Sequence, residues 1–183
     1  IAGTDTAQIY DDSGSEIRTD VGSGKQQFVG VFGQLSIRPT QSFEVLASGR
    51  YQHFRDYDGF DGSAGGLGTV ADQSFNSFDP RLSVRWELND AIALRAAAYK
   101  AFRAPTLDNL YRSFSTAFGI FYGNPALQPE TLRGGEVGFD FTRANARVQV
   151  TAFTNTIDHL LTSRTLSFND LPSGFFYGSR NIN

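Results

Sequence analysis

The sequence predicts an all-β fold, an antiparallel up-and-down meander that forms part of a large transmembrane β-barrel. Three observations lead to this prediction. Apolar and polar residues alternate along six segments, and short and long connections alternate between those segments. The strands expected around these segments run to roughly 10 or more residues, which matches the roughly 9 to 11 that a tilted membrane strand needs. Alternation with a period of two places apolar side chains on one face of a strand and polar side chains on the other.

Residues 81–88 show the clearest alternation, because the even positions from Leu82 to Leu88 are apolar and the odd positions from Arg81 to Glu87 are polar. Leu46 breaks the pattern of its own segment. Lys100 falls on the apolar face near a strand end, where its ammonium group can reach a polar layer. The other five segments with this pattern are 29–37, 43–52, 92–98, 137–141 and 148–152. We therefore expect six to seven strands.

The connections between these segments are short at 38–42, 89–90 and 143–145, and long at 57–77, 104–131 and 162–176. In a meander, this strict alternation puts all the short turns at one end and all the long loops at the other, as in outer-membrane barrels. Aromatic residues of the apolar face lie close to the short turns, as an interfacial girdle requires. These are Phe43, Trp86, Phe139 and Phe141.

Composition excludes several classes of protein. With no cysteine, the 183-residue chain has no disulfide framework, no thiolate metal site and no cysteine nucleophile. A net charge of −3 without a basic stripe argues against nucleic-acid binding. No apolar run reaches the roughly 18 residues of a membrane helix. The chain begins at Ile1 and shows no signal peptide, so we expect it to be a piece of a longer protein.

Motifs for enzymatic chemistry are weak. Gly22-Ser23-Gly24-Lys25 echoes the end of a phosphate-binding loop, but Thr19 stands where the first glycine is required and Gln26 stands where Ser or Thr is required. The two histidines, His53 and His159, belong to no metalloprotease motif, and no serine lies in a nucleophile elbow. We therefore expect no enzyme and no cofactor.

The most specific string in the chain occupies the second long connection and its flanks. It runs from Phe-Arg-Ala-Pro-Thr at 102–106 through Leu-Tyr at 110–111 and Asn-Pro at 124–125 to Pro-Glu at 129–130 and Glu-Val-Gly at 136–138. This order and spacing resembles the β-barrel of TonB-dependent outer-membrane receptors, over about residues 26 to 183. Gly134-Gly135 departs from the family pattern, which has a polar and an aromatic residue there. The residues that match the family motif are Phe102, Arg103, Pro105, Asn124, Pro125, Pro129, Glu130 and Glu136.

The resemblance implies a barrel of about 22 strands closed by a plug. Residues 1–183 are then a partial barrel domain from which the plug and the C-terminal strands are absent. It also implies a receptor in the outer membrane of a Gram-negative bacterium, surrounded by outer-membrane lipid. Its external loops bind a scarce nutrient, such as siderophore-bound iron or a cobalamin-like chelate. The TonB complex, contacted through the missing N-terminal part, energises uptake.

Two other classes of function stay open at this point. A passive outer-membrane channel shares every argument about the strands and differs by having no plug. A soluble carbohydrate-binding β-sandwich also shows alternating strands, because it buries its apolar face in a core rather than in lipid.

The residues of the motif also have a direct physical interpretation. Pro105 cannot donate a hydrogen bond to a sheet and favours extended geometry at Ala104, so 102–106 is the exit of a strand from the sheet. Arg103 and Glu130 lie at the mouths of two strands. We expect a mutual ion pair or a bond to a loop backbone that holds the rim, and direct contact with ligand is the alternative.

Aromatic residues are concentrated in the second long connection, where leaving them in water is costly. They either pack the loop against its neighbours, which is the favoured interpretation, or line a ligand vestibule. The candidate ligand-binding residues are Tyr111, Arg112, Phe118, Phe121 and Tyr122.

Three carboxylates lie close together in the first long connection, at Asp56, Asp58 and Asp61. Oxygen ligands at such spacing suit Ca²⁺, but the distal bidentate glutamate of an EF-hand is missing. A solvated acidic loop is the favoured interpretation, so we assign no metal site and keep these residues as a weak candidate.

Overall fold

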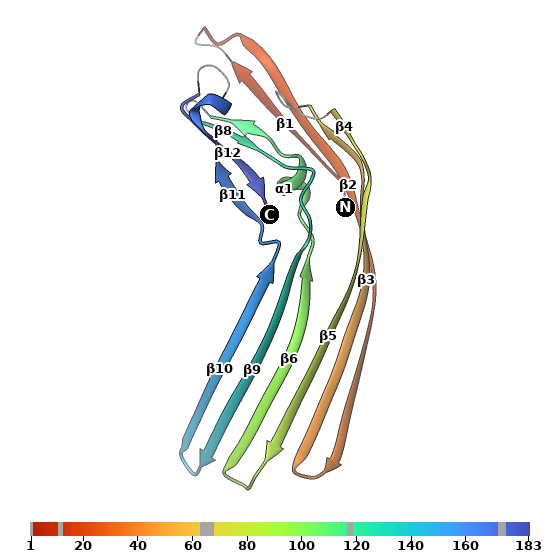
Figure 1. Ribbon diagram of the computed structural model, residues 1–183, viewed down its shortest axis with the longest axis vertical. Coiled ribbons are helices and arrows are strands. Elements are labelled where there is room, and N and C mark those ends of the chain that lie inside the picture. The colour runs from red at the N-terminus through yellow and green to blue at the C-terminus, as the bar shows by residue number, and fades with distance from the viewer. Residues whose placement is uncertain (1, 11–12, 63–67, 117–118, 172–174) are drawn as a thin grey trace.

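The main feature of the computed structural model is an eight-stranded antiparallel sheet, curled into part of a barrel (Figure 1). The structure describes residues 2–10, 13–62, 68–116, 119–171 and 175–183. The sheet has the order β1-β2-β3-β5-β6-β9-β10, and β4 pairs with β3. Its strands are β1 (Ala2–Tyr10), β2 (Glu16–Thr40), β3 (Phe43–Asp61), β4 (Gly68–Val70), β5 (Gln73–Glu87), β6 (Ile92–Arg103), β9 (Glu130–Arg143) and β10 (Ala146–Asp158).

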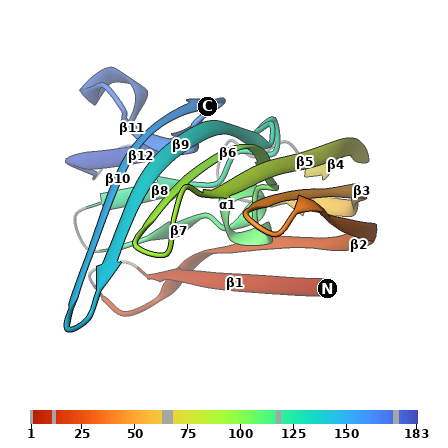
Figure 2. The same cartoon turned by 90° about the horizontal axis from the view of Figure 1, so that it is seen from below.

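A second, smaller sheet lies at one end of the first. It has the order β11-β12-β8-β7, and we name it the loop sheet. Figure 2, which looks along the molecule from below, shows the strands of the main sheet as an arc, with the elements of the long connections on its concave side. The loop sheet and its neighbours consist of α1 (Leu107–Tyr111), β7 (Phe114–Ser115), β8 (Gly119–Tyr122), β11 (Thr162–Thr165), the 3₁₀ turn η1 (Phe168–Asp170) and β12 (Tyr177–Ile182).

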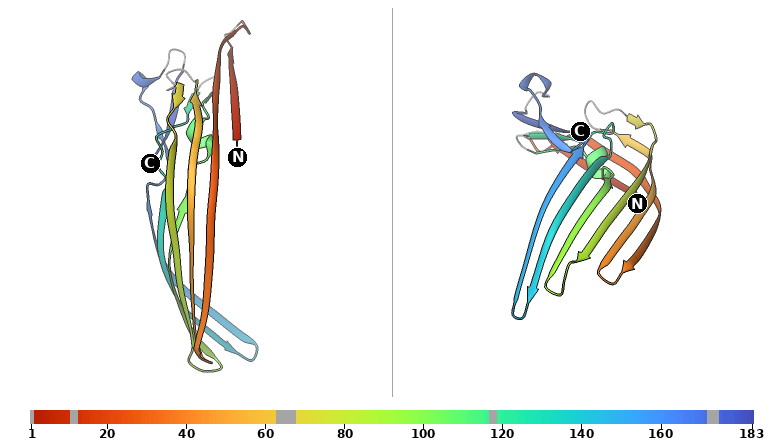
Figure 3. Two further views of the ribbon diagram at one scale, coloured as in Figure 1. Left: turned by 90° about the vertical axis from the view of Figure 1, so that its right-hand side faces the viewer. Right: turned by 60° about the horizontal axis from the view of Figure 1, so that its bottom comes forward.

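The all-β meander predicted from the sequence is confirmed. Five of the six predicted segments lie wholly in the strands β2, β3, β6, β9 and β10, and the sixth, 81–88, lies in β5 except for Leu88, which follows the end of that strand at Glu87. The short turns at 41–42, 88–91 and 144–145 lie together at the lower end in Figure 1, and the long connections lie at the upper end. The two views in Figure 3 show the same separation from other sides. In the turn after β5, the Asn89 side chain accepts hydrogen bonds from the backbone N–H groups of Ala91 and Ile92 at 2.9 and 3.0 Å.

The two faces of the sheet follow the predicted alternation. Cross-strand partners share a face, and the register joins Val84 to Ala96, Ala96 to Val137 and Val137 to Ala152. This convex face leaves large apolar side chains open, with Val137 60% exposed. The aromatic residues near the short turns lie on it, since Phe43 is opposite Trp86 and Phe139 is opposite Leu94. The convex face is therefore the apolar band.

The polar residues line the concave face, together with Leu46, the exception noted in the sequence, and with Phe32 and Phe153, which lie opposite Arg50 and Glu136. Leu46 is opposite Ser83, and both line a hollow on this face with Glu44. Within the described ranges, no helix is both long and apolar enough to cross a membrane.

The strands extend beyond the alternating segments, which corrects the predicted connections. β3 continues to Asp61 and β5 begins at Gln73, so the first long connection covers 62–72 and not 57–77. β1, which pairs with residues 16–25 of β2, was not predicted as a strand. Beyond the apolar band both faces of these strands carry polar residues, so the period of two disappears from the sequence although the hydrogen-bonded ladder continues.

The orientation of the sheet can be tested on β2. Val31 lies on the convex face and is 67% exposed, whereas Gln34 lies on the concave face opposite Ser48. If the convex face meets lipid, Val31→Arg should reduce the free energy of unfolding of the full-length barrel by about 2 to 4 kcal/mol, and Gln34→Arg by much less. Unfolding titrations in lipid measure both. Equal destabilisation by the two substitutions would contradict the assignment of faces.

Candidate functional site

The candidate site lies where the main sheet divides, at the end with the long connections. The β5–β6 pairing stops at Arg81 opposite Tyr99, while the β6–β9 pairing continues to Arg103 opposite Glu130. On the other side, β5 stays paired with β3 as far as Gln73 opposite Asp56. The division leaves a gap in the ladder between β5 and β6, and we name this gap and its contacts the seam.

Two glutamine side chains and a group of phenylalanines close the seam. Gln26 Nε2 donates to the Pro105 carbonyl at 2.8 Å, and Gln73 Nε2 donates to the Pro125 carbonyl at 2.6 Å. Phe54 is 0% exposed. Its ring centroid lies 4.8 Å from that of Phe28, 6.1 Å from that of Phe75 and 6.4 Å from that of Phe102. The motif residues Phe102, Pro105 and Pro125 therefore join the loop to the wall.

Helix α1 begins at a capping box three residues after the end of β6. The Thr106 hydroxyl accepts a hydrogen bond from the Asn109 N–H, and the Asn109 side chain accepts one from the Thr106 N–H. This reciprocal pair satisfies backbone donors that the first turn of a helix leaves open. The helix ends at Tyr111, and this residue lies against glycines of β2 and β3. Figure 1 shows α1 next to β2.

Tyr111 lies across three glycines of the wall and is 4% exposed. A Cβ atom at Gly22 would clash with the Tyr111 carbonyl oxygen, one at Gly24 would come within 2.5 Å of the Tyr111 ring, and one at Gly59 within 2.7 Å of the Tyr111 hydroxyl. Only glycine permits this approach. Burial and the charges of Asp56 and Asp72 raise the pKa of Tyr111 to about 12, so its phenol is neutral at physiological pH.

Around Tyr111, the loop has a hydrophobic core of its own. Leu110 and Leu127 are buried with Tyr111, and the partly buried side chains of Val70, Leu107 and Leu161 pack against them. These residues come from three different connections, so the core holds the long loops to one another as well as to the wall.

Glu130 forms a junction at the rim. Its carboxylate lies 3.0 Å from Arg103 Nη1 and also accepts a hydrogen bond from the Leu161 N–H at 2.7 Å. The ion pair predicted from the sequence is therefore present, and the bond to a loop backbone is present as well. The Glu130 side chain is 8% exposed. Loss of a partner would leave a buried carboxylate uncompensated, which destabilises a protein more than the loss of a partner in an exposed ion pair.

Asn124 and the two prolines of the motif shape the return of the loop. Asn124 Nδ2 donates to the Asn181 carbonyl at 2.9 Å, and Asn181 Nδ2 donates to the Asn109 carbonyl at 3.1 Å. Pro125 and Pro129 are buried on either side of Leu127. Asn124 thus ties the second long connection to β12, and Glu130 ties its end to Leu161, just before β11.

The candidate ligand residues divide into two groups. Tyr111 and Tyr122 are buried, so within the described residues they pack the loop. Phe121 is partly exposed, Arg112 is exposed, and Phe118 lies outside the described residues.

Phe121 belongs to a stack of three rings. Its ring stacks on Phe114 at 4.7 Å between centroids and lies 5.8 Å from Tyr177. Arg112 lies 5.1 Å from the centre of the Phe114 ring, and Arg180 lies 5.2 Å from that of Tyr122. Arg180 and Tyr122 are opposite one another and lie on the other face of the loop sheet from Phe121 and Tyr177. We name Phe114, Phe121, Tyr177 and Arg112 the aromatic surface. Arg112 also lies 3.4 Å from the carboxylates of Asp5 and Asp108. Flat rings beside a guanidinium group can bind a planar ligand without covalent chemistry.

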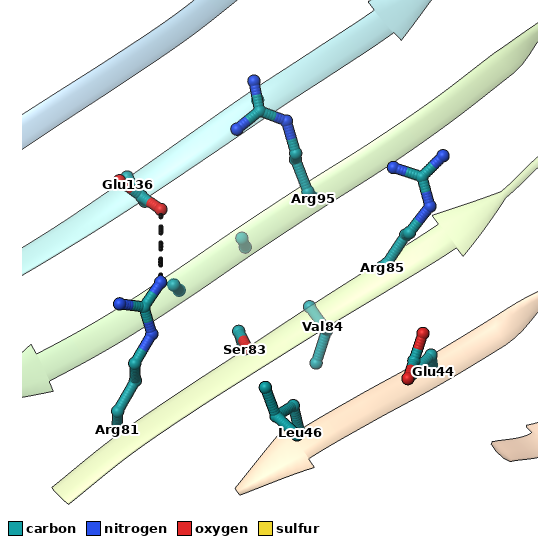
Figure 4. A pocket seen from close by; sticks show the side chains of 11 residues that line it. Glu44, Leu46, Arg81, Ser83, Val84, Arg85, Arg95 and Glu136 are labelled. Atoms are coloured by element: carbon teal, nitrogen blue, oxygen red, sulfur yellow. Dashed lines mark ion pairs between the residues drawn. The ribbon is translucent and has the colours of Figure 1, made fainter. Parts of the chain in front are cut away.

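Glu136 lies lower on the concave face, apart from the aromatic surface. Its carboxylate is 3.9 Å from Arg81 Nη2 on the wall of a hollow of about 300 Å³ (Figure 4). Arg85 and Arg95 line the same hollow and both bind Asp140, at 3.1 and 3.0 Å. This part of the wall is a polar network of arginines and carboxylates.

The three carboxylates of the weak candidate metal site do not form a loop. They lie in β3, where Asp56 and Asp61 are buried and Asp58 pairs with Lys25 at 2.8 Å. Among the described residues, no group of three His, Cys, Asp or Glu side chains is placed to hold a metal ion.

Sequence reasoning missed several residues of this site. Gly22 and Gly24 were considered only as part of a phosphate loop, although glycine inside a strand is itself a signal of close backbone approach. Tyr177, Arg180 and Asn181 come from β12, and no local pattern indicates that they meet the second long connection. Their contacts depend on the parallel pairing of β12 with β8.

Comparisons with known proteins agree with the fold. A family model described as TonB-dependent receptor-like β-barrel matches residues 2–183. A hemin receptor of Yersinia enterocolitica is 31% identical over 149 residues, which are 72% of this chain and 20% of that protein. The chain thus spans about a fifth of the length of this relative.

Solved structures show the same fold at low sequence identity. The haemophore receptor HasR of Serratia marcescens, solved with its haemophore HasA and haem, is 16% identical with a TM-score of 0.69, over 100% of this chain and 36% of that one. The FrpB iron transporter of Neisseria meningitidis is 17% identical with a TM-score of 0.56, over 91% and 22%. The siderophore receptor PirA of Pseudomonas aeruginosa is 15% identical with a TM-score of 0.57, over 90% and 39%.

The seating of Tyr111 generates a prediction about glycine. Gly24→Ala places a methyl group against the Tyr111 ring and should loosen the loop by about 1 to 3 kcal/mol, because the ring has to move. Gly33→Ala, in the same strand, meets open space and is the matched control. The rate of limited proteolysis within 104–129 of the full-length protein measures the difference. Equal rates for the two variants would show that Tyr111 does not anchor the loop.

Proposed function

The chain belongs to the TonB-dependent receptor β-barrel family, and on that premise we propose that it forms part of the wall and external loops of an outer-membrane receptor for a scarce nutrient. The observation that carries this proposal is the family match over residues 2–183, which includes both the wall and the packed long connections. The apolar convex face and the clustering of the long connections at one end fit the same role.

The chain is a segment of a longer barrel domain in this proposal. It covers 20% of the hemin receptor and 36% of HasR, and its main sheet is open, with β1 and β10 at its edges. A barrel in lipid has no open edge, because unpaired backbone groups are costly there. The plug and the segment that contacts the TonB complex then lie in other parts of the receptor, which sits in the outer membrane of a Gram-negative bacterium.

The nutrient is an iron-containing or similar metal chelate, and hemin is the first candidate. The hemin receptor of Yersinia enterocolitica supports this choice. Hemin is a flat macrocycle with carboxylate groups, and the aromatic surface offers aromatic rings beside Arg112. Siderophore-bound iron and cobalamin-like chelates are the other candidates of the same class. The role of the chain is capture, and the energy for release inward comes from the TonB complex.

Ligand binding by the full-length receptor tests the function. In cells that lack their own copy, the receptor should bind hemin or a ferric chelate, and Phe121→Ala should weaken that binding by more than about 1 kcal/mol. Phe168→Ala is the matched control, since Phe168 is 72% exposed in η1 and makes no ring contact within the described residues. Surface abundance and thermal stability should stay unchanged in both variants. If cells with folded receptor bind none of the three kinds of chelate, the proposed function is wrong.

The orientation in the membrane can be tested separately by cysteine labelling. The chain contains no cysteine, so a single introduced thiol reports one position. Asp72→Cys, in the first long connection, should react with an impermeant reagent on intact cells, and Gln41→Cys, in a short turn, should react only after lysis. Full-length receptor with any other cysteine replaced is the background. The reverse labelling pattern would invert the proposed topology.

A further inference from the structure

A buried carboxylate lies at the centre of the contact between the wall and the second long connection. The register places Gln26 of β2, Asp56 of β3 and Gln73 of β5 in one row on the concave face. These two glutamines are the residues that bind the Pro105 and Pro125 carbonyls. Asp56 therefore lies between the two amide groups that hold the loop, in the upper part of β3 beyond the apolar band.

The surroundings of Asp56 disfavour a charged carboxylate. Asp56 is 2% exposed, and its Oδ1 atom accepts no hydrogen bond within the described residues. Phe54, at the centre of its group of phenylalanines, lies two positions away on the same face. Burial raises the pKa of Asp56 from its ordinary value of 3.8 to about 6, and a hydrogen bond with the Gln26 side chain offsets only part of this rise.

The groups that face Asp56 supply no positive charge. The two flanking glutamines are uncharged, and Tyr111 of α1, with its pKa of about 12, is neutral between pH 5 and pH 8. Asp61 lies further along β3 on the same face, and Asp72, whose charge acts on Tyr111, pairs with Arg55 at 2.7 Å. Among the described residues, no cation contributes to the pKa shift of Asp56. Loss of the Asp56 proton therefore creates a buried negative charge that no cation compensates.

We propose that Asp56 makes the attachment of the second long connection to the wall depend on pH. When the carboxyl group is protonated, the two glutamine amides and Tyr111 hold the loop against the wall. When it is charged, the loop opens more readily, because opening lets water solvate the charge. The same connection supplies Phe114 and Phe121 to the aromatic surface, so Asp56 also controls how firmly that surface is held. This regulation goes beyond the proposed receptor function and requires no nutrient ligand.

The direction of the pH dependence follows from two pKa values of Asp56. In the attached loop the pKa is about 6, and in the open loop, where water reaches the carboxylate, it returns to the ordinary value of 3.8. The attached state binds the proton more tightly. Its stabilisation by protonation is therefore fully present below pH 3.8 and is lost as the pH rises through about 6. Between pH 5 and pH 8, the equilibrium constant for opening should rise about tenfold.

Limited proteolysis of the full-length receptor without nutrient measures the opening. Protection is the cleavage rate of a synthetic peptide with the sequence of 104–129, divided by the cleavage rate within 104–129 of the receptor. This ratio cancels the pH dependence of the protease. It follows the opening equilibrium when opening and closing are fast compared with cleavage. Protection of the native sequence should be about tenfold greater at pH 5 than at pH 8. Equal protection at the two pH values would overturn the proposal.

Two substitutions in β3 identify the carboxylate that titrates. Asp56→Asn keeps the shape of the side chain but cannot ionise, so its protection should be the same at pH 5 and pH 8. Asp58→Asn is the matched control, because it removes an exposed carboxylate that pairs with Lys25, and it should keep the pH dependence of the native sequence. A pH dependence that persists in Asp56→Asn, or that disappears in Asp58→Asn, would contradict the assignment to Asp56.

Heat-modifiable gel migration shows whether each variant is folded. If Asp56→Asn does not fold, Asp56→Ser, which is smaller and also cannot ionise, replaces it with the same expected result. Nutrient binding is measured separately on the native sequence. A receptor that binds a chelate but shows no pH-dependent protection contradicts the role of Asp56 alone, and one that shows the pH dependence but binds no chelate contradicts the receptor function alone.

Discussion

The continuous antiparallel ladder from β2 to β10 is the constraint on which the other features depend. The backbone N–H and C=O groups of each strand form hydrogen bonds with the neighbouring strands. Successive side chains therefore point to opposite faces of the sheet. A slip of one residue would exchange the faces completely. The irregularities in the β2–β3 register fall at Ser23/Lys25 and at Ile37/Thr40, near the two ends. Between them the alternation is uninterrupted, and this is the part that carries the apolar band.

The ladder is interrupted between the upper parts of β5 and β6, and side chains of the wall bind the second long connection at this end of the sheet. Beyond Arg81 and Tyr99, β5 and β6 no longer form backbone hydrogen bonds with each other, although each stays paired with its other neighbour. The connection between β6 and β9 contains Pro105 and Pro125, which lack a backbone N–H group and therefore present only a carbonyl to be satisfied. Gln26 and Gln73 supply the donors. A proline-rich loop and amide side chains on the wall are thus complementary.

The sequence predicts the wall better than the loop, for a physical reason. The segment 81–88 has one face toward an apolar environment, so its period of two is visible residue by residue. The upper part of β3 from Asp56 to Asp61 is a strand of the same ladder, but it has polar neighbours on both sides and looks like a loop. The Arg103–Glu130 pair was predictable because opposite charges stand at two strand mouths. Tyr111 on Gly22 and Gly24 joins positions nearly ninety residues apart, and no local pattern of residues encodes that pairing.

The long connections act as one unit because their contacts cross between them. β12 pairs in parallel with β8, with Tyr177 opposite Gly119 and Arg180 opposite Tyr122, and Asn124 binds the backbone of Asn181. Glu130 adds a bond to Leu161, just before β11. A displacement of β8 therefore has to move β12 or break these bonds. Since Phe121 and Tyr177 belong to these two strands, the geometry of the aromatic surface is set by the hydrogen bonds beneath it, and Tyr111 in turn fixes those bonds to the wall.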